Sequence, residues 1–127
     1  MSVPWAMSAR PTLFAEFESE TKDDSYRWAI ANALEVLADD SAFEQIASLA
    51  ENPHFGRSRE MIVLALAKMT NPRANEVLIG LLSDEVVAVH ALHALAIRGA
   101  SVSASMVRPF LKHHQAWVRA EARKLLA

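Results

Sequence analysis

Apolar side chains recur along this chain at the spacing of helices that bury one face. Four segments, starting at Arg27, Arg59, Ala88 and Arg119, carry small or apolar residues three, six and seven positions after their first residue. These offsets lie on one face of an α-helix, which has 3.6 residues per turn. The segments follow one another at intervals of 29 to 32 residues, a period that predicts stacked helical units sharing a continuous core.

A second apolar pattern precedes each of these segments, so every unit predicts two helices, here called A and B. Phe14, Ile46, Leu78 and Val107 align in the four A helices, and each is followed three residues later by another large apolar residue. The predicted A and B helices span residues 11–19 and 25–38, 41–51 and 57–69, 72–83 and 86–98, and 103–113 and 115–126. The four units are expected at residues 11–38, 41–69, 72–98 and 103–127, after an N-terminal arm at 1–10.

Residues with known capping preferences stand at several of the predicted helix ends. Ser41 and Glu44 have the spacing of a capping box. Asn71 precedes Pro72 as an N-terminal cap, and Gly99 follows a B helix as a C-terminal stop. The signals agree with an all-α fold, an α–α superhelix of right-handed sense built from about four antiparallel helix pairs.

Proline inside the fourth A helix predicts a bend there. Pro109 lacks the N–H that an α-helix needs at this position. Ser48 and Gly80 occupy the aligned positions of the second and third units. Both are poor helix formers, so the sequence predicts a bend common to the three A helices.

The fourth unit resembles the HEAT repeat family. Val118-Arg119, followed by Ala122 and Leu125-Leu126, is similar to that family's V-R-x-x-A-x-x-L-L pattern. Arg108-Pro109-Phe110-Leu111 looks like the proline-containing end of its A helix. The short period is similar to the HEAT-like repeats of phycobilin lyases and of many bacterial proteins. The resemblance implies an α–α solenoid and says little about function, because scaffolds and a few enzymes share this fold.

The resemblance also implies a ladder of aspartates and arginines along the stack. In the family, an Asp between helices A and B often pairs with an Arg early in helix B. The residues of this chain at suitable places are Asp23 or Asp24, Asp84, Arg27, Arg59 and Arg119. We expect a structural role for these arginines, with capture of a phosphate or carboxylate as the alternative.

The composition and the lack of long apolar segments exclude several classes of site and of protein. The chain has no cysteine, which excludes disulfides, thiolate metal sites and a cysteine nucleophile. The first ten residues lack the pattern of a signal peptide, and no apolar run approaches the roughly 20 residues of a membrane span. The sequence therefore favours a cytoplasmic protein with no membrane contact.

Charge is divided unevenly between the two halves of the chain. Residues 16–51 carry ten acidic and two basic side chains, whereas residues 52–127 carry ten basic and five acidic ones. In a solenoid this division predicts an acidic end and a basic end. The two ends are either ordinary solvated surfaces or sites of head-to-tail association or of a partner with complementary charge.

The B helices of such a solenoid line its concave face, and their outward positions form the candidate binding surface. These positions are mixed, with an apolar strip, which favours a groove for a peptide or helix or a self-association surface. Trp28 is the expected anchor, although packing at an open first layer would also explain it. The predicted contact residues are Trp28, Asn32, Glu60, Leu64, Val89, His93 and Lys124.

The favoured function is a non-enzymatic scaffold or adaptor that binds a protein partner. His90 and His93 are three residues apart, a spacing that can bind metal, but no Cys or acidic third ligand lies at a typical metal-site spacing from them. No catalytic residue, metal site or cofactor is predicted. The alternative is an enzyme or enzyme accessory, either a chromophore-lyase-like protein or a DNA base-excision enzyme. Glu35 and Glu60 in the groove and an isoelectric point near 6.2 make nucleic acid an unfavoured partner.

The last predicted helix still shows a core pattern, and no polar capping layer follows it. A solenoid needs polar outer layers. The sequence therefore predicts either a homodimer through the C-terminal repeat or a fragment of a longer array.

Overall fold

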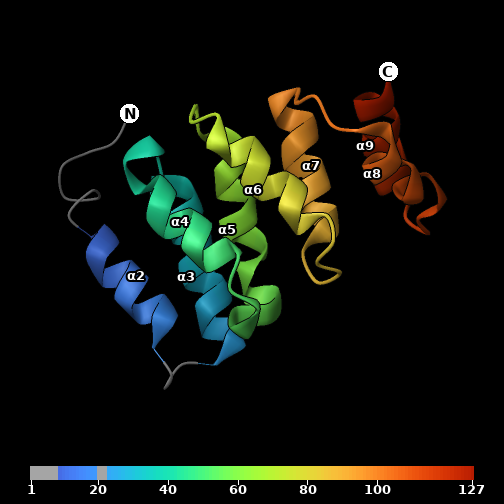
Figure 1. The fold of residues 1–127 in the computed structure, drawn as a ribbon. Helices are drawn as coiled ribbons and strands as arrows, with labels where there is room; N and C mark the ends of the chain where they lie inside the picture. The colour runs from blue at the N-terminus through green and yellow to red at the C-terminus, as the bar shows by residue number, and fades with distance from the viewer. Residues whose placement is uncertain (1–8, 20–22) are drawn as a thin grey trace.

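The computed structural model of this chain describes residues 9–19 and 23–127. These residues form eight α-helices and four short 3₁₀-helices, with no strand among them. Figure 1 shows the helices following one another in a row from α2 to α9, so the all-α superhelix is confirmed. The helices are α2 (Arg10–Glu18), α3 (Asp24–Leu37), η1 (Asp40–Ala42), α4 (Phe43–Ala50), η2 (Pro53–Arg59), α5 (Glu60–Ala65), η3 (Leu66–Lys68), α6 (Arg73–Leu81), α7 (Ala88–Arg98), α8 (Ala104–Val107), η4 (Arg108–Lys112) and α9 (Ala116–Leu126).

The helices are arranged as four A–B pairs. Helix α2 packs on α3, α4 on α5, α6 on α7, and α8 with η4 on α9. The B helices α3, α5, α7 and α9 also pack along one another in that order, whereas contacts between neighbouring A helices are sparse in the described part of the chain. The B helices therefore form the more closely packed layer of the stack, and their place on a concave side stays a prediction. The division into units and the arm at residues 1–10, most of which lies outside the described residues, stay predictions.

One hydrophobic core runs through all four pairs. Several alanines on the B helices are fully buried and let these helices approach closely: Ala31, Ala65, Ala91, Ala94 and Ala122. Burial of one leucine side chain contributes about 2 kcal/mol, so the shared core, rather than helix propensity, holds the stack together. The large residues at its centre are Phe17, Leu34, Ile46, Ile62, Leu66, Leu78, Leu92, Leu95, Val107 and Val118.

The predicted core positions are fully buried in the two inner B helices and only in part in the outer ones. In α5 with the following η3, and in α7, all six are buried. In α3 and α9, Ile30, Ala33, Leu125 and Leu126 are half-buried. Each outer helix has a described B-helix neighbour on one side alone, so its far side contributes less to the core. None of the described helices is long and apolar enough for a membrane span.

The capping box predicted at Ser41 is wrong, and the other two caps are confirmed. Asp39 caps η1 instead, because its carboxylate accepts both the backbone N–H of Ser41, at 3.0 Å, and the Ser41 hydroxyl. A charged carboxylate is a stronger acceptor than a hydroxyl. Asn71 accepts the N–H of Arg73 at 2.9 Å, and Gly99 ends α7 with a left-handed φ of 62°.

Proline changes the fourth A helix, but the bend predicted for three A helices is not shared. The α-helix ends at Val107 and continues as the 3₁₀-helix η4, because Pro109 has no N–H to donate to the Ser105 carbonyl. Helices α4 and α6 remain α-helical through Ser48 and Gly80. These two residues keep their N–H groups and cost at most about 1 kcal/mol of helix propensity, which core packing outweighs.

Candidate functional site

The arginines expected in a ladder bind backbone carbonyls at the end of the preceding A helix. Arg27 at the start of α3 donates to the carbonyls of Phe17, at 2.9 Å, and Ser19, at 2.7 Å. Arg119 in α9 donates at 2.8 Å to the carbonyl of His113, just after η4. Carbonyls at a helix end have no partner within the helix, so each guanidinium satisfies them and fixes the A–B turn.

Arg59 is the most deeply buried of these arginines and forms the clearest Asp–Arg pair of the expected ladder. Its guanidinium donates at 2.9 Å to the carbonyl of Ala50, to the carbonyl of Gly56 and to the carboxylate of Asp84. The hydrogen bond from Arg59 lowers the pKa of Asp84, while partial burial opposes that change. The Arg59 side chain is 1% exposed, so this group holds the stack together and is not accessible to an anion.

Two further connections between units do not follow from the repeat pattern. Arg98, at the end of α7, donates to the carbonyls of Leu66 and Met69 and, at 2.5 Å, to the side-chain oxygen of Asn75. Leu37 and Met69 stand at the equivalent positions of the first two B helices, so no periodic arginine marks this site.

Asp40 forms the second of these connections. Its carboxylate accepts the N–H of Thr70 at 3.0 Å and the N–H of Asn71 at 2.8 Å. These backbone hydrogen bonds, with the Thr70 hydroxyl, lower the pKa of Asp40. The start of the second pair is thereby joined to the turn before the third.

The predicted contact residues all lie on the four B helices and are at least partly exposed. We call the exposed side of α3, α5, α7 and α9 the B-helix face. The structure adds Trp117 in α9, which is 43% exposed, close to the 44% of Trp28 in α3. Sequence reasoning missed Trp117 because it precedes the repeated segment that starts at Arg119. The face comprises Trp28, Asn32, Glu60, Leu64, Val89, His93, Trp117 and Lys124.

Trp28 and Glu60 meet at one end of the B-helix face. They line a pocket of about 360 Å³ between the starts of α3 and α5. Asn32 does not reach this pocket, and its side chain instead donates to the Trp28 carbonyl at 3.2 Å. The pocket residues are Asp24, Ser25, Trp28, Arg57, Ser58 and Glu60.

Two glutamates of the B helices, exposed in part or buried, pair with histidines of a neighbouring helix. The Glu60 carboxylate lies 3.2 Å from Nε2 of His90, and Nδ1 of His93 lies 3.0 Å from the carboxylate of Glu121. These pairs connect α5 with α7 and α7 with α9. The ring of Trp117 meets His93 edge-on at 6.0 Å. The pair of His93 with Glu121 therefore helps to position the Trp117 side chain on α9.

Burial keeps His90 neutral at physiological pH. Desolvation lowers its pKa, and Coulombic interactions with His93 and Arg57 act in the same direction, whereas Glu60 opposes them. Its Nδ1 atom is buried and has no hydrogen-bond partner in the described chain. Protonation would place an unpaired N–H at this atom, which explains why the neutral form is favoured.

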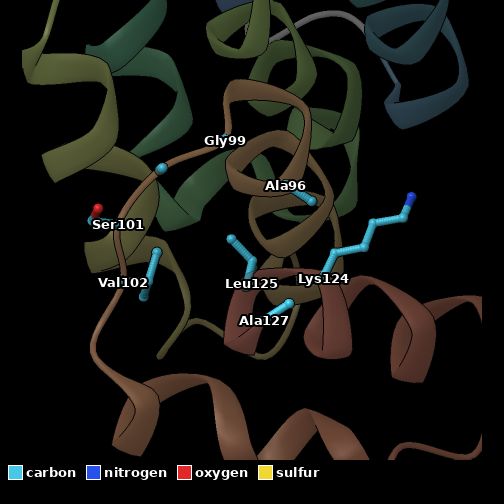
Figure 2. A pocket seen from close by; sticks show the side chains of 8 residues that line it. Ala96, Gly99, Ser101, Val102, Lys124, Leu125 and Ala127 are labelled. Carbon is cyan, nitrogen blue, oxygen red and sulfur yellow. The ribbon is translucent and has the colours of Figure 1, made fainter.

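A second pocket lies between the end of α7 and the end of α9. Figure 2 shows Leu125 pointing towards α7, with Val102 beside it, while the Lys124 side chain extends away with its amino group turned outward. Lys124 is thus separated from Trp28 and Glu60, which lie at the other end of the face. The pocket has a volume of about 350 Å³ and is lined by Ala96, Gly99, Ala100, Ser101, Val102, Lys124, Leu125 and Ala127.

The two histidines of α7 do not share a ligand. His90 faces Glu60 and His93 faces Glu121, so their imidazoles contact different helices. Within residues 9–19 and 23–127, no three or more His, Cys, Asp or Glu side chains are grouped so that they could hold a metal ion.

The family model for HEAT repeats matches residues 11–96. The chain belongs to the HEAT repeat family. The match covers the first three helix pairs, and the fourth pair of this HEAT stack follows it in space. HEAT repeats generally serve as protein-interaction scaffolds. No curated protein and no solved structure matches the chain.

Proposed function

We propose that this HEAT-repeat chain is a non-enzymatic scaffold that binds a segment of a partner protein on its B-helix face. The observation that carries the proposal is the pair of half-exposed tryptophans, Trp28 and Trp117, on the first and last B helices. Half-buried Leu64 and Val89 lie on the two helices between them. Tryptophans of this kind are the residues that most often dominate protein–protein binding energy.

Charge on the same face favours a protein over a nucleic acid as the partner. Glu35, Glu60 and Glu121 line the B helices, and each already has a positive or histidine partner within the chain. A phosphate backbone needs a run of uncompensated bases. A peptide with apolar side chains needs apolar contacts and aromatic anchors, and Leu64, Val89, Trp28 and Trp117 support this choice.

The test compares wild-type protein with the double variant Trp28→Ala, Leu64→Glu. Partners recovered from cell extract by the wild type are identified, and the affinity of the purified partner is measured for both proteins. Loss of an anchor of about 2 kcal/mol corresponds to binding weakened by about 30-fold. Circular dichroism and the unfolding midpoint establish that the variant is folded.

A matched double variant provides the control. Met106→Ala with Val86→Glu changes two exposed apolar residues outside the B-helix face in the same way. We expect this control to keep wild-type affinity. If every partner binds the Trp28, Leu64 variant as well as it binds the wild type, the B-helix face is not the binding surface.

A further inference from the structure

The outer end of the fourth helix pair carries basic side chains that have no partner. Arg108 and Lys112 on η4 and Arg123 on α9 are exposed, and their side chains form no hydrogen bond or ion pair within the described chain. Glu121 is the single acidic side chain between residues 99 and 127, and it is buried against His93. The exposed charged side chains of this end are therefore all basic.

The acidic half of the chain is different, because many of its carboxylates are already paired. Asp39 lies 3.0 Å from Arg10, and Glu44 lies 2.5 Å from Arg73. Asp40 accepts backbone hydrogen bonds from the next unit. Pairing thus reduces the exposed charge of the acidic half, where Glu18 and Glu51 remain exposed without a partner in the described chain, and leaves the bases of the fourth pair largely uncompensated.

Two of these bases, Arg108 and Lys112, line an apolar groove on the A-helix side of the fourth pair. The groove has a volume of about 720 Å³, twice the 360 Å³ of the pocket beside Trp28. Its lining is mostly apolar and comes from a single stretch of helix, where Pro109 converts the α-helix to a 3₁₀-helix. The lining residues are Ser105, Arg108, Pro109, Leu111 and Lys112.

We infer that this groove docks an acidic amphipathic segment of a protein partner, at a surface separate from the B-helix face. An apolar side chain of the segment covers Pro109 and Leu111. Flanking carboxylates pair with Arg108, whose planar guanidinium accommodates two carboxylate oxygens, and with Lys112. Charge complementarity and the apolar floor together define this occupant.

Two other occupants fit the groove less well. A nucleic acid would pair its phosphates with Arg108 and Lys112 and leave the apolar floor uncovered. A second copy joined through the same C-terminal end would place like charges opposite each other, which opposes the symmetric dimer that the sequence predicted. The acidic end of a second copy has much of its charge already paired.

The test uses a random peptide display library selected against the full chain. Wild-type protein is compared with the double variant Arg108→Glu, Lys112→Glu. We expect the wild type to enrich peptides with Asp or Glu around apolar residues. The best of these, made synthetically, is expected to bind the double variant at least about tenfold more weakly. Chemical shifts of backbone amides should change in residues 104–112 when the peptide is added.

A control with the same change of charge separates the groove from general electrostatics. Arg123→Glu with Arg73→Glu alters two exposed bases outside both the groove and the B-helix face and, at physiological ionic strength, should change peptide affinity by less than about threefold.

Three results would overturn the inference. The first is that wild type and groove variant select the same peptides, or peptides without acidic residues. The second is that a DNA duplex binds the wild type more tightly than the best peptide and loses affinity for the groove variant. The third is self-association in sedimentation that the groove variant abolishes, which would make a second copy the occupant.

Discussion

Basic side chains have opposite roles at the centre and at the outer end of this HEAT stack. At the junction of the second and third pairs, Arg59 and Arg98 bind carbonyls and polar side chains of neighbouring elements. At the fourth pair, Arg108 and Lys112 extend into solvent and bind nothing within the described chain. The same residue types therefore stabilise the stack in one region and remain available to a partner in the other.

The difference shows that net charge along the sequence is a poor guide to binding in a repeat protein. A buried guanidinium with several acceptors contributes to stability and cannot be reached from outside. An exposed base without a partner contributes almost nothing to stability. The two regions can therefore be separated by measuring stability and binding on the same variants.

The largest expected effect is the loss of Arg59. In Arg59→Ala, the Asp84 carboxylate loses its charged partner and the carbonyls of Ala50 and Gly56 lose their donor. We expect the free energy of unfolding to fall by about 3 kcal/mol, as for other broken buried ion pairs. Urea unfolding followed by circular dichroism measures this change.

Arg57→Ala is the matched control for that variant. Arg57 is two residues away, its side chain is 82% exposed, and it lies 3.8 Å from Glu60. Its loss should change the free energy of unfolding by less than about 0.5 kcal/mol. Equal losses in the two variants would show that burial of Arg59 is not what stabilises the junction.

A smaller loss is expected when Arg98 is replaced. Arg98→Ala removes hydrogen bonds to Leu66, Met69 and Asn75, but the side chain is only half-buried, so water can replace some of them. We expect a decrease of about 2 kcal/mol in the free energy of unfolding. Hydrogen exchange should locate the weakening in residues 66–75; uniform exchange along the whole chain would argue against a local connection.

His90 predicts a dependence of stability on pH. Its pKa in the folded protein lies below the ordinary value of 6.5, because burial disfavours the charged form. The stability that neutral His90 contributes is fully present above the ordinary pKa of 6.5. It is lost as the pH falls from 6.5 through the lower pKa of the folded state. Aspartates with a lowered pKa, such as Asp84, lose their contribution to stability only as the pH falls below their ordinary pKa of 3.8. The effects of His90 and of the aspartates therefore occur in different pH ranges.

The variant His90→Gln tests this dependence. We expect the unfolding free energy of the variant to fall less than that of the wild type between about pH 7 and pH 5. His114→Gln, which changes an exposed histidine, is the control and should follow the wild-type curve. Parallel curves for wild type and His90→Gln would contradict the role assigned to burial.

The smallest effect on stability is expected at the basic end. The variant Arg108→Glu, Lys112→Glu should keep the free energy of unfolding within about 0.5 kcal/mol of wild type, because neither side chain has a partner to lose. Urea unfolding tests this directly. A clear loss of stability would mean that these bases belong to the structural set with Arg59.

The sequence predicted the helices well because core residues repeat, and it predicted the surface less well because contacts between units do not. Ile62, Ala65 and Leu66 recur in other units, and a recurring apolar face can be recognised without coordinates. Arg98 and Asp40 have no periodic equivalents, and their acceptors are backbone atoms whose positions depend on the assembled stack. Trp117 and the Glu121–His93 pair likewise lie at places that only the packing of α9 on α7 brings together.

The most direct test of the proposed function uses the tryptophans as reporters. The chain has three tryptophans, so protein labelled with 5-fluorotryptophan gives three ¹⁹F resonances, which Trp→Phe variants assign. As a partner segment is added, we predict that the resonances of Trp28 and Trp117 both shift and follow the same saturation curve. If the segment saturates the protein while both resonances stay in place, it binds elsewhere and the B-helix face is not the functional surface.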